Sequence, residues 1–172
     1  MIDILRNRRS VRKFTDNKIE TEKINILQEA LLLSPTSRNI DPCEFIMVRD
    51  KITLEKLSKL KPHGAAFIKE CDTAFVICGD TAKSDVCVTD CSIASIILQL
   101  EAESIGLKSC WAQVNKRFHN EEMYAEQYVR ELLHIPENFT VVSVIAVGYP
   151  AETRPPKTSD SLKKEKIHNE RF

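Results

Sequence analysis

The chain has 172 residues, of which 25 are Lys or Arg and 25 are Asp or Glu, so its formal net charge is zero. Hydrophobic residues make up 42% of the sequence, which is enough for one core, and a single domain over residues 1–172 is expected at this length. The balanced charge disfavours a protein that wraps nucleic acid, and the four glycines lie too far apart for a dinucleotide-binding or P-loop motif.

Cysteine usage and apolar runs indicate the cellular compartment of the protein. No apolar leader precedes the charged N-terminal segment, and the longest mostly apolar stretch, residues 91–100, is too short to span a bilayer. We therefore expect a cytoplasmic protein without membrane association, whose six cysteines are free thiols. Cys87 and Cys91 lie one helical turn apart, but without a C-x-x-C motif or a nearby histidine they favour structural thiols over a metal site.

Apolar periodicity and proline or glycine breaks divide the chain into alternating helices and strands, which indicates an α/β or α+β layout. In chain order the sequence predicts a short helix from residue 2, a helix capped by Thr21 and ended by Pro35, a strand at 45–48, a helix at about 53–60, a strand at 74–78, a long helix at about 85–105 ended by Gly106, a strand at 107–114, a helix at 121–133 ended by Pro136, and a strand at 141–147.

Two of these segments need partners. The long helix is apolar on nearly every side in its middle, so it must be covered by its own sheet and, as a candidate, by a second subunit. The 22 residues from 151 to 172 carry too few large apolar side chains to build a core, so we expect a tail that is either frayed or packed across another surface.

Two polar segments are candidates for ligand binding. Arg8, Arg9, Ser10 and Arg12 place three guanidinium groups and a hydroxyl within five residues, a set that suits a phosphate, although a solvated helix end has the same composition. The loop at 35–42, stiffened by a proline at each end, presents donors and acceptors suited to a planar heterocycle, or is an ordinary loop after a helix.

A third candidate is residues 106–111, where a strand leaving a glycine turn can place backbone N–H groups beside a ligand. The alternative there is that Trp111 belongs to the core, as a single tryptophan usually does. None of the four histidines pairs with a serine or cysteine in a nucleophile motif, which disfavours a hydrolase.

Taken in order, these segments resemble the FMN-dependent nitroreductase family. The resemblance is carried by RRSVRKF at 8–14, PTSRNIDPCEFI at 35–46, GLKSCW at 106–111, IPE at 135–137 and VGYP at 147–150. It runs nearly end to end and implies an α+β fold with a mixed sheet flanked by helices, an obligatory homodimer, and two FMN sites that each use both subunits. The tail from about 151 to 172 would wrap the partner subunit.

The resemblance also implies a set of cofactor contacts. These are Arg8, Arg9, Ser10 and Arg12 at the FMN phosphate and ribityl chain, Pro35, Thr36, Ser37 and Asn39 from the other subunit at the isoalloxazine, the backbone N–H groups of Gln113 and Val114 near flavin N5, and Lys157 at the phosphate. The chain departs from the family pattern at Asp41, where Gln is usual, at Cys43, where Trp is common, and at 158–160, where a second basic residue often follows Lys157.

The implied activity is hydride transfer from NADH or NADPH through bound FMN to a nitroaromatic, a quinone or a similar small acceptor. Such chemistry needs no protein nucleophile, because the flavin carries the electrons, so no catalytic side chain and no metal are assigned. Two alternatives stay open. The same flavin site could serve flavin fragmentation, dehalogenation or dehydrogenation, or the chain could be a non-enzymatic protein whose basic run binds an acidic partner or nucleic acid.

Overall fold

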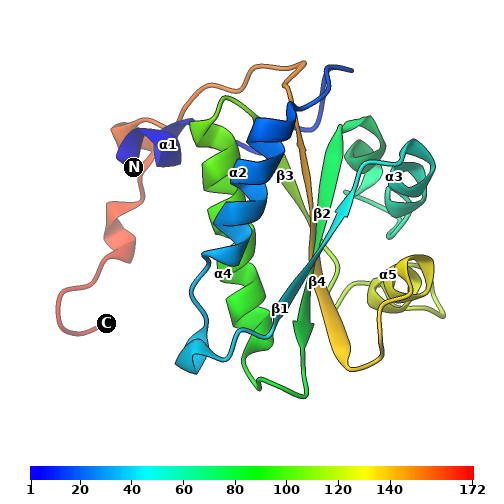
Figure 1. Ribbon diagram of the computed structural model, residues 1–172. Coiled ribbons are helices and arrows are strands. Elements are labelled where there is room, and N and C mark those ends of the chain that lie inside the picture. Colours follow the sequence, from blue (N-terminus) through cyan, green and yellow to red (C-terminus); the bar gives the residue numbers. More distant parts are fainter.

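A four-stranded sheet forms the centre of the computed structural model, which describes residues 1–172 (Figure 1). The strands lie in the order β1-β2-β4-β3, with bounds of Cys43–Val48 for β1, Thr73–Asp80 for β2, Lys108–Gln113 for β3 and Phe139–Gly148 for β4. The predicted apolar runs at 74–78 and 141–147 become the two central strands, β2 and β4, which are buried along almost their whole length.

All three strand pairs are antiparallel, which corrects the expectation of a mixed sheet. Parallel geometry occurs only in an isolated bridge between Ser10 and Ser109. The N-terminal segment does not extend this bridge into a strand, because it crosses from β3 to the end of β4, where the Thr15 N–H donates to the Tyr149 carbonyl. The α+β class is confirmed, with this single parallel contact at the edge of the sheet.

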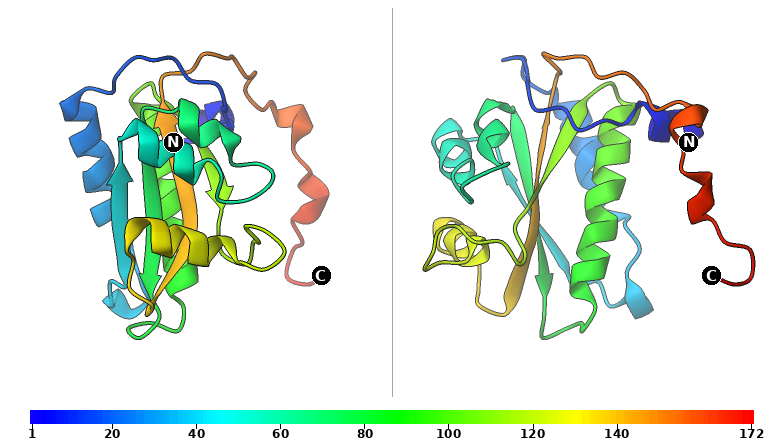
Figure 2. Two further views of the ribbon diagram at one scale, coloured as in Figure 1. Left: turned by 90° about the vertical axis from the view of Figure 1, so that its right-hand side faces the viewer. Right: turned by 180° about the vertical axis from the view of Figure 1, so that it is seen from behind.

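Helices cover both faces of the sheet (Figures 1 and 2). The bounds are Thr21–Leu32 for α2 and Cys87–Ser104 for α4 on one face, Lys51–Leu57 for α3 and Ala125–Leu133 for α5 on the other, and Ile2–Asn7 for α1, which packs against α4. Successive side chains of β2 point to opposite faces of the sheet and pack in two separate cores. Phe75 and Ile77 pack beneath α2 and α4, while Val76 packs on the side of α3 and α5. No helix combines the length and the apolar character needed to cross a membrane.

Several predicted boundaries shift. Thr21 is the first residue of α2 and not its cap, since Glu20 occupies the N-cap, and the helix ends at Leu32, before Pro35 is reached. Helix α5 begins only at Ala125, because the Asn120 side chain accepts the next backbone N–H groups and turns the chain at the residues predicted to be helical. Gly106 ends the long helix as predicted, with a positive φ of 79°.

Helix α4 keeps an apolar face that one chain does not fully cover. Its buried side includes Ala94 and Leu98, which lie against the sheet, whereas Val88 remains 39% exposed and Ile96 38% exposed. The chain itself therefore covers most of this helix, and cover of the remaining part by a second subunit stays a prediction.

The segment after β4 lies along the chain's own N-terminus. The N–H of Ala151 donates to the Lys13 carbonyl at 2.8 Å, and the N–H of Lys157 donates to the Arg6 carbonyl at 2.9 Å. Beyond these contacts residues 153–172 are exposed and form only two short 3₁₀ turns. The tail has no core of its own, as predicted.

Candidate functional site

Residues 8–12, called here the arginine segment, lie along the free edge of the sheet. Strand β3 is an edge strand, and the Val11 N–H donates to the Ser109 carbonyl at 3.2 Å, which fixes Ser10 beside Ser109. Val11 is buried and anchors the segment in the core, while Arg8, Arg9 and Ser10 are half-buried. The sequence run that suits a phosphate thus begins at the C-cap of α1, Arg8, and is held against a strand edge at Ser10 and Val11.

The same edge presents free backbone amides. The Val114 N–H donates to the Val142 carbonyl of β4 at 3.1 Å, and in an antiparallel ladder alternate residues point to opposite sides. Ser109, Trp111 and Gln113 therefore direct their backbone groups away from β4, toward the free edge, where Ser109 bonds the arginine segment and the Gln113 carbonyl bonds Lys61. The sheet already uses the Val114 amide, and the Val114 side chain is fully buried, so Gln113 carries the outward-facing N–H at this point of the chain.

The side chain of Gln113 is fixed by its neighbours. Its amide oxygen accepts a hydrogen bond from Trp111 Nε1 at 2.9 Å, and its amide nitrogen donates to the Asn115 carbonyl at 3.1 Å. The Gln113 carbonyl accepts a bond from Lys61 Nζ at 2.9 Å. Trp111, for which the core was the alternative to a ligand-binding strand, is half-buried and packs at the margin of the core below α4.

Positive charge at this edge is not neutralised within the chain. No ion pair involves Arg8 or Arg12. Burial raises the pKa of the nearby Cys110 thiol, and the charges of Arg12 and Arg8 together with the Ser10 side chain oppose that rise. Burial and the charge of Arg117 lower the pKa of Lys61. The arrangement therefore favours an anion.

The tail holds the arginine segment from its other side. A Glu152 carboxylate oxygen accepts the backbone N–H of Arg12 at 2.7 Å, which is the main reason that the pKa of Glu152 is lowered. Arg154 pairs with the same carboxylate at 2.9 Å and offsets its charge. The Arg9 guanidinium donates to the Pro155 carbonyl. These contacts bring the backbone of Lys157 to the end of the molecule that carries the arginine segment.

Residues 35–39, called here the polar loop, lie at the first turn of α4. The Ser37 N–H donates to the buried carboxylate of Asp90 at 3.0 Å, and Thr36 Oγ1 accepts the Asp41 N–H at 3.0 Å. Asn39 and Asp41 both have a φ of 54°, in the left-handed region that non-glycine residues rarely adopt. Hydrogen bonds therefore hold the loop in one strained conformation, which is typical of ligand-binding sites.

The arginine segment and the polar loop lie at opposite ends of α4 (Figure 1). Helix α4 has 18 residues, so its ends are about 25 Å apart at about 1.5 Å per residue. The polar loop binds Asp90 near the start of the helix, and α1 with the following arginine segment lies at the other end. One copy of the chain therefore does not bring the two predicted groups of residues to the same ligand.

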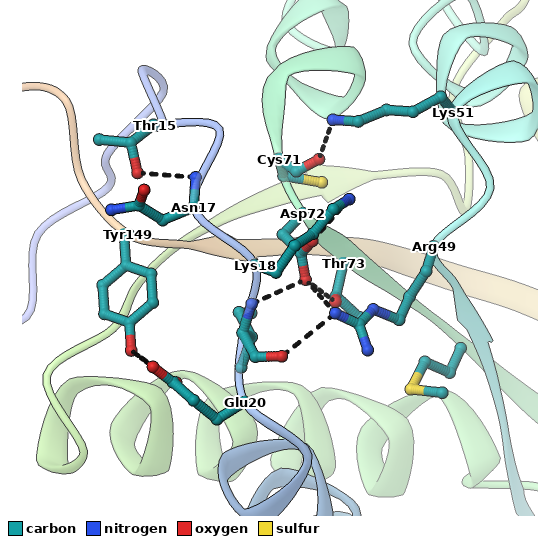
Figure 3. A network of polar contacts seen from close by, with 12 residues as sticks. Thr15, Asn17, Lys18, Glu20, Arg49, Lys51, Cys71, Asp72, Thr73 and Tyr149 are labelled. Carbon is teal, nitrogen blue, oxygen red and sulfur yellow. Dashed lines mark hydrogen bonds and ion pairs between the residues drawn. The ribbon is translucent and has the colours of Figure 1, made fainter.

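A buried carboxylate fixes the connection between these two regions (Figure 3). Asp72 pairs with Arg49 at 2.9 Å and with Lys18 at 3.2 Å, and it accepts the Ile19 N–H at 3.3 Å and the Thr73 hydroxyl at 2.9 Å. Burial acts to raise the pKa of Asp72, but these bonds outweigh it and the pKa is lowered. The network is a structural anchor at the start of α2.

Comparison with known proteins agrees with this geometry. The model of the nitroreductase family matches residues 5–70 and 61–149. The chain belongs to the nitroreductase family. The sequence resemblance is thereby confirmed over most of the chain.

Three members of the nitroreductase family show how close the match is. The structure of an FMN-dependent nitroreductase from Clostridium difficile R20291 superposes with a TM-score of 0.99 at 38% identity, covering 100% of both chains. A protein of Methanothermobacter thermautotrophicus with the provisional name NADH dehydrogenase/NAD(P)H nitroreductase is 34% identical over 100% of this chain and 87% of its own length. A protein of Archaeoglobus fulgidus with the same provisional name is 35% identical over 99% of this chain and 98% of its own.

In this nitroreductase-family chain, the residues predicted for one cofactor are spread along α4. Arg8, Arg9, Ser10, Arg12 and the Lys157 backbone lie near the last turns of α4, and Pro35, Thr36, Ser37 and Asn39 lie near its start. Gln113 and Val114 lie between them, because Gln113 pairs with Ser143, whose hydroxyl is 2.9 Å from that of Ser95 in the middle of α4. Sequence reasoning missed Lys61 and Phe67; the Arg12 guanidinium lies 6.0 Å from the centre of the Phe67 ring. Lys61 carried no signal because it follows a lysine-rich helix of the same composition.

Proposed function

We propose that the protein is an NAD(P)H-dependent FMN oxidoreductase that passes hydride from a nicotinamide through bound FMN to a nitroaromatic, a quinone or a similar small acceptor. One observation carries the proposal. The arginine segment, in which Arg8 and Arg12 have no ion-pair partner, is bonded by its backbone to the edge strand β3 at Ser109. Family membership and the named FMN dependence of the Clostridium difficile relative support the choice of flavin.

The chemistry of the donor set fits FMN part by part. A phosphate dianion needs paired N–H donors and positive charge, which Arg8, Arg12 and the Ser10 hydroxyl supply. A planar ring needs donors fixed along one line, which the Gln113 N–H and the neighbouring strand edge supply. Lys61, held on the Gln113 carbonyl, adds a cation at the same edge. Lys157 is the further candidate for the phosphate.

Completion of the site requires a second copy of the chain. Pro35, Thr36, Ser37 and Asn39 are proposed to line the isoalloxazine, yet they lie about 25 Å along α4 from the arginine segment of their own chain. A homodimer in which the polar loop of one copy meets the arginine segment of the other satisfies both assignments. The partly exposed apolar side chains of α4 and the exposed tail are the surfaces proposed to cover the partner.

The protein's part in the reaction is to bind and orient. FMN, when bound, would supply the hydride-transfer chemistry, which no side chain here supplies. Arg8 and Arg12 hold the phosphate, and the Gln113 N–H sets the position of the ring edge. The polar loop of the partner covers one side, which leaves the opposite ring face for donor and acceptor in turn. No protein nucleophile is needed.

The decisive experiment examines the purified protein. We expect a yellow protein that releases FMN on heating and oxidises NADH or NADPH when a nitroaromatic or a quinone is present. A protein that is colourless, that gains no visible absorption with added FMN and that binds oligonucleotides in a salt-dependent way would exclude the proposal in favour of a non-enzymatic role. An FMN-loaded protein without such turnover would indicate other flavin chemistry at the same site.

A further inference from the structure

Two cysteine thiols meet between the start of β1 and the second turn of α4. Cys43 Sγ and Cys91 Sγ lie 3.5 Å apart, and both residues are buried. Space for them exists because Gly79, opposite Cys43 in β2, has no side chain. A Cβ placed on Gly79 would lie 3.0 Å from Cys91 Sγ and 2.9 Å from the Cβ of Cys87. The thiols therefore face each other across a gap that only glycine leaves open.

The two thiols differ in their access to solvent. Cys43 is 9% exposed and lines a pocket of about 550 Å³ between α2 and β1, whose wall includes Leu31, Phe45 and Lys83. Cys91 is fully buried behind Cys43 and does not line this pocket. A small oxidant entering the pocket reaches Cys43 first and reaches Cys91 only through it.

The thiols also differ in acidity. The hydrogen bond with Cys91 lowers the pKa of Cys43, and it outweighs the opposing effects of burial and of the Asp90, Asp41 and Glu44 carboxylates. The pKa values of the five other cysteines are all raised. Because the thiolate is the reactive form, Cys43 is the thiol of this chain best suited to attack an oxidant.

We propose that Cys43 and Cys91 are a modification site, an oxidisable thiol pair that a hydroperoxide converts into a disulfide. The Cys43 thiolate attacks one oxygen of hydrogen peroxide, the O–O bond breaks, and the displaced hydroxide takes up a proton to leave as water. Cys43 is then a sulfenic acid. Cys91 sulfur attacks Cys43 sulfur, the S–O bond breaks, and the leaving hydroxyl departs as water with the Cys91 proton. In total two thiols lose two electrons to one peroxide, which yields two waters.

The disulfide would move the polar loop. An S–S bond is about 2.05 Å long, so the two sulfurs must approach by about 1.5 Å. The disulfide would join Cys43, the first residue of β1, to α4 beside Asp90, whose carboxylate accepts the Ser37 N–H. An effect on flavin binding through the polar loop rests on the proposed function. Formation of the disulfide does not, so the experiment reads the bond itself.

Peptide mapping of the whole protein tests the proposal. The native protein is treated with hydrogen peroxide, its remaining thiols are alkylated, and it is digested with trypsin without reductant. Cys43 falls in the peptide 39–49, and Cys87 and Cys91 fall together in the peptide 84–108. We expect one cross-link between these peptides that disappears on reduction. Absence of the cross-link in the oxidised wild-type protein, with Cys43 left as a free thiol or as a sulfinic acid, overturns the proposal.

Variants identify the partner sulfur within the second peptide. Cys87→Ser should keep the cross-link, whereas Cys91→Ser should lose it and leave a Cys43 sulfenic acid that dimedone traps. Cys71→Ser is the matched control, because Cys71 is also buried but hydrogen-bonds the Ile68 carbonyl, and it should leave the cross-link unchanged. A cross-link that survives in Cys91→Ser assigns the partner to Cys87 and refutes the pair. Should Cys91→Ser not fold, Cys91→Ala gives the same comparison.

Discussion

Arg12→Ala removes a guanidinium that has no ion-pair partner within the chain, so the substitution breaks no internal salt bridge. The contact with Glu152 is made by the Arg12 backbone and survives the change. The loss should therefore fall on the proposed bond to the FMN phosphate. A hydrogen bond to a charged group contributes about 1.5–3 kcal/mol, and each 1.4 kcal/mol is about tenfold in affinity. We expect the Kd for FMN to rise about 10- to 150-fold.

Fluorescence titration of the apoprotein with FMN and, separately, with riboflavin measures this effect. Riboflavin lacks the phosphate, so Arg12→Ala should change its affinity little, while the affinity for FMN falls. Lys13→Ala is the matched control, because it removes one exposed charge from the neighbouring residue. The phosphate assignment is wrong if Arg8→Ala and Arg12→Ala both keep wild-type affinity for FMN, or if riboflavin binding weakens as much as FMN binding does.

Other predictions test the tail and the core. Deletion of the residues after Pro150 removes four hydrogen bonds to residues 6–13, so FMN affinity and dimerisation should fall together; an intact yellow dimer in sedimentation would contradict this. Gly79→Ala places a Cβ 2.9 Å from Cys87 Cβ and should lower the free energy of unfolding, measured in urea, by about 1–3 kcal/mol. An unchanged free energy of unfolding would show that α4 can shift away from β2 without loss of stability. Asp72→Asn should cost about 1.5–3 kcal/mol at pH 7. Because the pKa of Asp72 is lowered in the folded state, its contribution to the free energy of unfolding is complete above its ordinary pKa of about 3.9. The contribution is lost as pH falls through the folded pKa, so the stability difference between wild type and Asp72→Asn should shrink in acid. A stability difference that is constant with pH would refute this account.

The parts of the fold that could be predicted from the sequence are those that local chemistry decides. The runs 74–78 and 141–147 are rich in Val and Ile and almost wholly apolar, which is typical of a central strand buried on both faces. Gly106 supplies the positive φ that ends α4. The start of α5 could not be predicted, because residues 121–124 are acceptable in a helix and the Asn120 side chain, bonding to the following backbone, decides against it.

The parts of the candidate site that could not be predicted depend on strand pairing. Whether Gln113 or Val114 offers its N–H to the free edge is a matter of register, and a shift by one residue reverses the answer. The sequence pattern is the same in both registers. Lys61 was missed for a related reason: only the folded chain shows that its ammonium group reaches the carbonyl of Gln113, 52 residues later.

The distance between the arginine segment and the polar loop is fixed by rigid structure. Residues 13–20 connect the arginine segment to α2, and Asp72 and Arg49 bind both backbone polar groups of Ile19 within this connection. From this anchor α2 runs to the polar loop, which in turn is bonded to Asp90 at the first turn of α4. A flexible connection would let the loop fold back onto its own arginine segment, but two packed helices and a buried ion pair prevent it. The polar loop is therefore held away from the arginine segment of its own chain, which is why the proposed site needs a second copy to bring the two together.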